Sequence, residues 1–324
     1  MYYPNFIEEV CYQEHHINKV LHEINKSIPG YFQKFIDTEN GTTVTADVAA
    51  KISVNIGATS NPSHKPKDPK KVLERILKES IADFESDRKI YQDILHPEAL
   101  AEYGLDKGSF KNTVLKNLVP IIRKTLQNRR AEELDKYRKA FNYAKSGDLY
   151  DVVHRIVSFA EKWKSTWYNS EQFEKIKRYA DLDYNVLDKE DYTSYGVIGG
   201  GIKSAFLYKL YPYMFSNRSR SAIWALWYLT EKKQLGCKED SEFLMINIKV
   251  GTTQQNYFYP YALFSYYALQ IYIKLKSLYA IHEVSLPIEY RFVVVEKFLT
   301  FIAHQHQNEI ELLKQDSQNY EYEY

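Results

Sequence analysis

The sequence predicts a mainly α-helical protein that carries one small β element. Apolar residues recur at helical spacing through most of the 324 residues, and 44% of the chain is hydrophobic, enough to bury a sizeable interior. The clearest strand pattern is the apolar run at about residues 242–250, and a looser alternation at about 42–56 predicts a possible second, short strand. The expected fold is therefore a multi-helix body with a minor β element.

Two regions are expected along the chain, because 324 residues is long for one hydrophobic core. Residues 1–110 form an N-terminal helical region, which contains a loop rich in Pro, Ser and Lys at 58–71. Pro29, followed by glycine, should close the first helical pattern, and Asp68 should cap the helix that follows the loop. Residues 111–324 form an aromatic-rich C-terminal helical domain.

Caps and apolar stripes define the helices expected in the C-terminal region. Helical patterns cover residues 148–163 and 202–215, an aromatic helix extends to residue 279, and Pro287 opens the last helix. The acidic connector at 181–191 lacks the glycine and the closing glutamate of a calcium-binding loop, so it is expected to face solvent.

Composition limits the classes of partner and the compartment. With 43 basic and 42 acidic residues, no global field attracts nucleic acid or a membrane, so any anion site must be local. No apolar stretch is free enough of polar residues to span a bilayer, and Glu8 and Glu9 interrupt the early apolar run that a signal peptide would need. A cytoplasmic location is expected. The chain has 29 tyrosines. This number is typical of partly hydrated interfaces and ligand grooves, or it reflects the codon usage of an AT-rich genome.

Neither a metal site nor a cofactor is predicted, apart from Mg²⁺ under the nuclease alternative given below. Cys11 and Cys237 lie far apart and lack a CxxC or Cys/His spacing, which argues for a reducing compartment and against a disulfide framework or a zinc ribbon. His15 and His22 could share a helix face, but two histidines without a third ligand make a weak metal site.

A glycine turn that leads into a helix is the main candidate for an anion site. Its residues are Gly199, Gly200, Gly201, Lys203 and Ser204. The glycines can expose consecutive backbone N–H groups at a helix start, where phosphate binds favourably. The stretch departs from a P-loop because Ile202 separates the last glycine from the lysine, and no apolar strand leads into it. The alternative is that the glycines let two backbones pass closely.

Two arginines stand at the next helix start. Arg218 and Arg220 precede the apolar helix that contains Trp224 and Trp227, and the macrodipole disfavours cations at that end. A compensating anion is therefore expected nearby. It is either a protein carboxylate or a bound phosphate held by bidentate guanidinium contacts.

The function expected from these residues is binding of a phosphorylated ligand, with nucleic acid as the leading class. Tyr257, Tyr259 and Tyr261 could stack on bases, although packing against the tryptophan helix is the alternative. A local anion site on a nearly neutral chain would suit a prokaryotic defence or mobile-element protein.

Two alternatives stay open. Asp240, Glu242 and Lys249 resemble the acids and lysine of a Mg²⁺-dependent nuclease, but Asn247 stands where that pattern needs a carboxylate. The chain could instead be an interaction subunit whose Tyr-rich surface binds a protein partner or its own copy. No family is identified from these motifs, because each one fails at a required residue.

Overall fold

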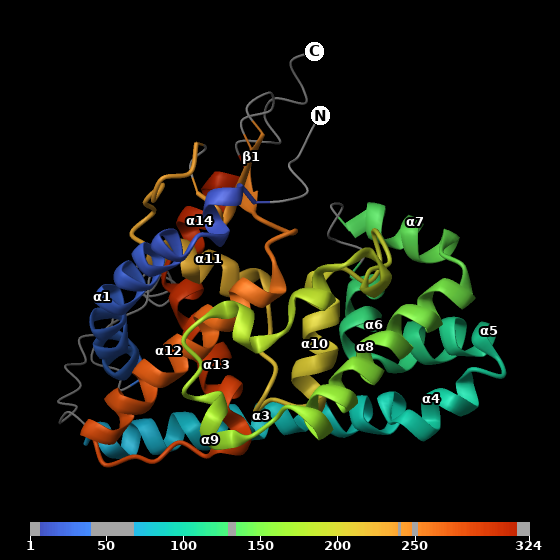
Figure 1. Cartoon of the computed structure of the whole chain (residues 1–324), viewed down its shortest axis with the longest axis horizontal. Helices are drawn as coiled ribbons and strands as arrows, with labels where there is room; N and C mark the ends of the chain where they lie inside the picture. The colour runs from blue at the N-terminus through green and yellow to red at the C-terminus, as the bar shows by residue number, and fades with distance from the viewer. Residues whose placement is uncertain (1–6, 40–67, 129–133, 239–240, 248–251, 316–324) are drawn as a thin grey trace, which may run out of the picture.

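A computed structural model describes residues 7–39, 68–128, 134–238, 241–247 and 252–315 of the chain. Helices dominate this part of the protein, and the strands form one two-stranded antiparallel sheet (Figure 1). The predicted fold class, mainly α with a small β element, is therefore confirmed.

The elements fall into three groups. The α-helices are α1 (Glu14–Glu39), α3 (Pro69–Leu95), α4 (Pro97–Tyr103), α5 (Lys107–Ser109), α6 (Pro120–Gln127), α7 (Asp135–Tyr143), α8 (Ser146–Thr166), α9 (Ser170–Phe173), α10 (Gly200–Leu210), α11 (Arg220–Leu229), α12 (Tyr261–Ile281), α13 (Arg291–Gln305) and α14 (Gln307–Gln315). The other helical segments are η1 (Glu9–Tyr12), η2 (Phe110–Leu118), η4 (Tyr179–Leu182), η5 (Asn185–Asp188), η6 (Glu190–Tyr192) and η7 (Ile288–Tyr290). The strands are β1 (Leu244–Asn247) and β2 (Thr252–Gln255).

Helix α1 continues through the position where the sequence predicts a break. Pro29 lies inside α1, although proline removes one helical hydrogen bond and crowds the preceding turn. Ile24, Ile28 and Phe32 are buried on either side of it, and α1 packs on α12. Burial of this apolar face outweighs the local preference to stop, so the prediction of a break at Pro29 is wrong.

The hairpin lies where the sequence predicts a strand, and it adds a second strand that the sequence analysis missed. Leu244 pairs with Gln255, and Met245 pairs with Gln254. Strand β2 is Thr-Thr-Gln-Gln, which carries no apolar alternation and therefore gives little strand signal. The possible strand at 42–56 lies outside the described residues.

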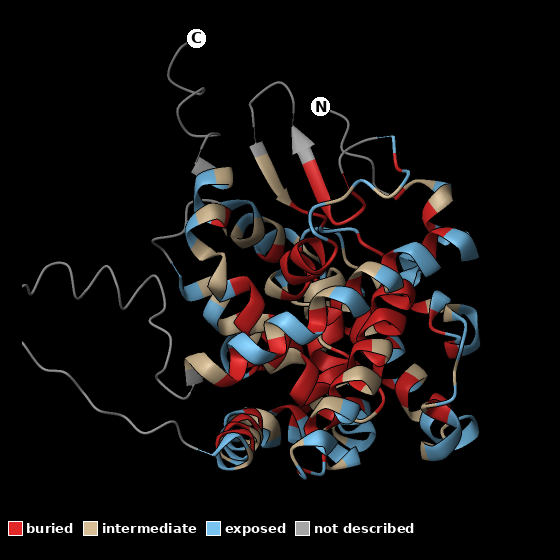
Figure 2. Ribbon diagram, turned by 90° about the vertical axis from the view of Figure 1, so that its left-hand side faces the viewer, coloured by how far each residue is buried: buried red, intermediate tan, exposed pale blue. Residues whose placement is uncertain are grey.

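The core is built around helices that are apolar on most of their circumference. Helix α12 buries residues along its whole length, and it packs on α1 and α13, while α13 also packs on α11. The buried residues gather in the middle of the molecule (Figure 2). Several buried tyrosines have hydroxyl partners, as when Tyr184 donates to the carbonyl of Met214 at 2.9 Å and Tyr150 donates to that of Leu100 at 2.7 Å. Tyrosine thus serves as a core residue here.

The helices are arranged along the long axis of the molecule. Helix α3 runs along one long edge, α4 to α8 gather at one end, and α1 with α11 to α14 occupies the other (Figure 1). Helix α10 stands between the two groups and packs on α3 and α8. The division into regions at residue 110 stays a prediction. Among the described helices, none combines the length and the apolar character needed to cross a membrane.

Candidate functional site

The predicted glycine turn forms the start of α10. Gly199 is the N-cap residue, and it has no side chain that could cap this end of the helix. Among the described residues, no side-chain acceptor is found for the first N–H groups of α10. A Cβ on Gly199 would meet no atom within 4 Å, whereas one on Gly200 would lie 1.9 Å from Nη2 of Arg218. A Cβ at position 200 would therefore force the Arg218 guanidinium, which packs directly against this backbone, to move.

Lys203 and Ser204 point into the protein. The buried Nζ of Lys203 donates to the carbonyl of Leu187 and, at 3.3 Å, to Oγ1 of Thr193. Oγ of Ser204 accepts a hydrogen bond from the backbone N–H of Arg218 at 3.0 Å. Both residues therefore join α10 to neighbouring segments, whatever they contribute to ligand binding.

Arg218 is buried between the start of α10 and the segment that precedes α12. Its Nη2 donates to the carbonyl of Tyr257 at 2.8 Å, and its Nη1 donates to that of Asn256 at 3.4 Å. Its Nε is shielded from solvent and has no hydrogen-bond partner among the described residues. The contacts found for this guanidinium are thus with carbonyl oxygens and not with a carboxylate.

Asp188 is the carboxylate that interacts electrostatically with both cations. It accepts hydrogen bonds from the backbone N–H groups of Tyr261 at 2.8 Å and Ala262 at 3.2 Å, and so caps α12. Burial lowers the pKa of Lys203 to about 8 and that of Arg218 to about 10, although Asp188 opposes both shifts. Two buried cations therefore share one carboxylate, which belongs to an exposed residue.

Arg220 and two aromatic side chains reach the surface beside this buried group. The guanidinium of Arg220 lies 5.7 Å from the ring centre of Tyr257. Tyr257 and Phe258 are 39% and 43% exposed. Tyr259 and Tyr261 are buried, and their hydroxyls donate to protein oxygens. Of the three tyrosines considered for base stacking, Tyr257 is the one with an exposed ring.

The residues of the nuclease alternative are only partly described. Asp240 and Lys249 lie outside the described residues, and Glu242 is buried. The carboxylate of Glu242 is hydrogen-bonded to His16 and to the hydroxyl of Tyr259. The described part of the chain gives this alternative no geometric support.

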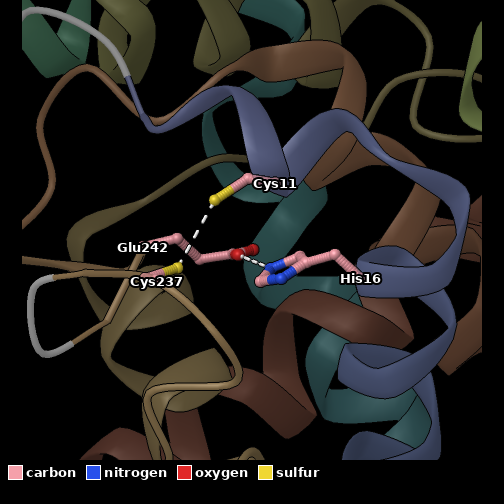
Figure 3. Close-up of side chains that lie close together, drawn as sticks. All are labelled: Cys11, His16, Cys237 and Glu242. Carbon is pink, nitrogen blue, oxygen red and sulfur yellow. Dashed lines mark hydrogen bonds and ion pairs between the residues drawn. The ribbon is translucent and has the colours of Figure 1, made fainter.

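Sequence analysis missed a group of metal-ligating side chains in the interior. The group, named the Cys2HisGlu cluster, consists of Cys11, His16, Cys237 and Glu242 (Figure 3). One ligand atom from each residue lies within 4.8 Å of the others, and all four residues are buried. The two Sγ atoms are 3.6 Å apart, and Nε2 of His16 is hydrogen-bonded to Oε2 of Glu242. The four side chains point toward a common centre.

Two distant parts of the chain build the cluster. Cys11 lies on η1 and His16 in the first turn of α1. Cys237 follows a turn in which Leu235 and Gly236 have φ angles of 52° and 102°. A non-glycine residue in the left-handed region persists only where the surrounding structure requires it, and here the turn carries a ligand candidate into the interior.

Proton sharing links the four residues in pairs. The hydrogen bond between the thiols raises the pKa of Cys11 and lowers that of Cys237, and burial adds to the first shift. Burial lowers the pKa of His16, but the hydrogen bond and the charge of Glu242 outweigh it, so the net shift is upward. A hydrogen bond therefore links the two potential ligand atoms within each pair.

The cluster has almost no local signal in the sequence. Its two halves are separated by 226 residues, and each half consists of a cysteine and a second ligand with four residues between them. Such spacing is too common to indicate a metal site. The chain has no match among protein-family models, curated proteins or solved structures, so no relative indicates a ligand for it either.

Proposed function

We propose that the protein binds a phosphorylated ligand at the surface where α10 and α11 begin, and that single-stranded nucleic acid is the ligand class. The observation that carries the proposal is the excess of positive charge. Lys203 and Arg218 are buried, the carboxylate that interacts with both belongs to the exposed residue Asp188, and Arg220 is exposed at the start of α11. Two buried positive charges thus face one negative charge, an excess of about +1 that costs free energy unless an anion offsets it. A phosphate would supply that anion.

The helix starts strengthen the positive potential. Helix α10 begins at Gly200, and its N-cap residue, Gly199, has no side chain that could cap it. In the part of the chain that the structure describes, no atom lies within 4 Å of the place that a Cβ on Gly199 would occupy. Oriented N–H groups at a helix N-terminus bind phosphate oxygens, and glycine lets those oxygens approach the backbone. In the proposed complex, a phosphate contacts the first turn of α10 and the guanidinium of Arg220.

The exposed aromatic side chains favour a ligand with bases. Tyr257 lies within reach of the Arg220 guanidinium, and Phe258 is exposed next to it. Base–aromatic stacking beside a cation is the usual combination in proteins that bind single strands, because unpaired bases offer their faces. A single strand is therefore favoured over a duplex.

An acidic groove restricts the direction in which a strand could run. It lies on the side of Thr193, which Lys203 contacts, and its acidic lining residues are Asp148, Asp151, Glu190 and Asp191. These carboxylates repel phosphate. The strand would therefore extend from the start of α10 over Tyr257 and away from this groove.

The test is fluorescence anisotropy with a labelled single-stranded oligonucleotide, as DNA and as RNA, over a range of salt concentrations. Wild-type binding should weaken with salt. Arg220→Ala should reduce the slope of log K against log salt by about 0.7, the value for one lost phosphate contact on a single strand. Tyr257→Ala should lower the affinity by about 1–3 kcal/mol at an unchanged slope.

Two variants serve as matched controls. Arg178→Ala removes another exposed arginine, which pairs with Asp181, and Tyr143→Ala removes a ring that is 87% exposed. Both should bind like wild type. No binding by wild type at low salt, or full binding by Arg220→Ala and Tyr257→Ala, would refute the proposal. Binding of a mononucleotide without binding of the oligonucleotide would support the phosphate site but refute single-stranded nucleic acid as the ligand.

A further inference from the structure

The geometry points to a structural zinc site in the Cys2HisGlu cluster, which fastens η1 and α1 to the segment that leads into β1. Two sulfur atoms, one imidazole nitrogen and one carboxylate oxygen provide four donors. Zinc prefers four-coordinate tetrahedral sites made of these donor types, and four protein ligands leave no open position for a substrate. The site therefore has a structural and not a catalytic role. It is independent of the phosphate site proposed above.

The sulfur spacing matches metal ligands. A tetrahedral zinc ion with Zn–S bonds of about 2.3 Å places two sulfurs about 3.8 Å apart. The Sγ atoms of Cys11 and Cys237 are 3.6 Å apart. A disulfide requires about 2.0 Å, so oxidation would have to draw the two cysteines closer by well over an ångström.

The other two ligand atoms would have to move apart to hold a metal ion. Nε2 of His16 and Oε2 of Glu242 are joined by a hydrogen bond. A zinc ion would replace the shared proton and set these atoms about 3.3 Å apart, the edge of a tetrahedron with bonds of about 2.0 Å. The hydrogen bond to Glu242 orients the imidazole through Nε2.

Neighbouring groups orient the ligands in the way that metal sites require. The hydroxyl of Tyr259 donates to Oε1 of Glu242 at 2.7 Å, which leaves Oε2 directed at His16. Oε1 of Glu8 accepts a hydrogen bond from the backbone N–H of Lys238 at 2.7 Å, which ties the segment of one cysteine to that of the other.

The donor set selects the metal. Magnesium and calcium take oxygen ligands, so two thiolates exclude them. Copper(I) favours sulfur, but a mixed tetrahedral set of sulfur, nitrogen and oxygen is typical of zinc. Zinc binds thiolates, a carboxylate and an imidazole nitrogen that carries no proton, so its binding would displace the protons held on these atoms and release them to solvent.

The first experiment measures metal in the full-length protein, purified under reducing conditions without chelator. Elemental analysis should give about one zinc per chain. Protein stripped of zinc and titrated with cobalt(II) should develop the thiolate-to-cobalt absorption of a tetrahedral site. Cys11→Ser and Cys237→Ser should lose this band, and Tyr259→Phe should keep it with an affinity that is roughly 10–100-fold lower. His15→Ala, at the exposed position next to His16, should bind metal like wild type.

Serine variants can fail to fold, so wild type alone also tests the inference. Zinc-loaded protein should melt at a higher temperature than stripped protein, and added zinc should restore the difference. Equal melting temperatures would overturn the structural role. Wild type that binds neither zinc nor cobalt, or an intact mass lower by two hydrogens that indicates a disulfide, would overturn the site itself.

Discussion

Replacing Glu296 with glutamine should stabilise the protein at pH 8 and leave its stability at pH 4.5 nearly unchanged. Glu296 is on α13, beside the start of α11, where Nδ2 of Asn217 donates to its Oε1 at 3.1 Å. Its Oε2 is shielded from solvent and has no hydrogen-bond partner among the described residues. Burial raises the pKa of Glu296 to about 7 from the ordinary value of 4.5.

The sign and size of the effect follow from proton linkage. Below pH 4.5 the carboxyl is protonated in both the folded and the unfolded chain. As the pH rises from 4.5 to about 7, the unfolded chain loses this proton first, so the free energy of unfolding falls by about 1.4 kcal/mol per pH unit. Above pH 7 both states are ionised, and the accumulated loss is about 3 kcal/mol. Glutamine keeps the acceptor for Asn217 and has no charge to bury.

Urea unfolding followed by tryptophan fluorescence at pH 4.5, 6 and 8 measures the effect. The advantage of Glu296→Gln over wild type should grow with pH, and other titrating groups cancel in the difference. Glu289→Gln, at an exposed position nearby, should show no such trend. A constant difference between wild type and Glu296→Gln at all three pH values would refute the reasoning, because it would mean that folding does not shift the pKa of Glu296.

Two further substitutions test the packing under the proposed phosphate site. Gly200→Ala should lower the melting temperature, because its Cβ would lie 1.9 Å from Nη2 of Arg218. Gly199→Ala is the control and should melt like wild type. Equal melting temperatures for the two variants would contradict the close approach at Gly200. Lys203→Met should weaken oligonucleotide binding in the anisotropy assay by removing one buried positive charge. Wild type should also gain stability relative to Lys203→Met as the pH rises from 8 to 10.5, because the folded chain loses the Lys203 proton first; urea unfolding at both pH values checks this sign.

The helices were predictable from sequence because their signals are local. Asp68 caps α3 as expected, since its side chain accepts from the backbone N–H of Lys70, and Ser219 caps α11 in the same way. The continuation of α1 through Pro29 was not predictable, because it depends on the apolar surface of α12 that covers the neighbouring residues. Strand β2 likewise exists because β1 lies beside it.

The two candidate sites differ in how far sequence reasoning could reach. The glycines and arginines at the starts of α10 and α11 belong to local patterns, so they could be predicted from the sequence. The burial of Lys203 and Arg218 could not, because it depends on Leu187 and Asn256 in other segments. The Cys2HisGlu cluster depends entirely on tertiary contacts between segments separated by 226 residues. Sequence spacing could not bring its halves together.

The placement of α1 has a consequence for protein synthesis. His16 leaves the ribosome 226 residues before Glu242, and at about 5–20 residues per second the second residue follows roughly 10–45 s later. Until residue 220 has been made, α1 can pack on α3 but has neither α11 nor α12 to cover its apolar face. The first long helix to be made is thus completed by the last third of the chain. A nascent chain that stalls before residue 242 exposes an apolar helix to chaperones and proteases, so a stop codon there should eliminate the whole protein and not merely shorten it.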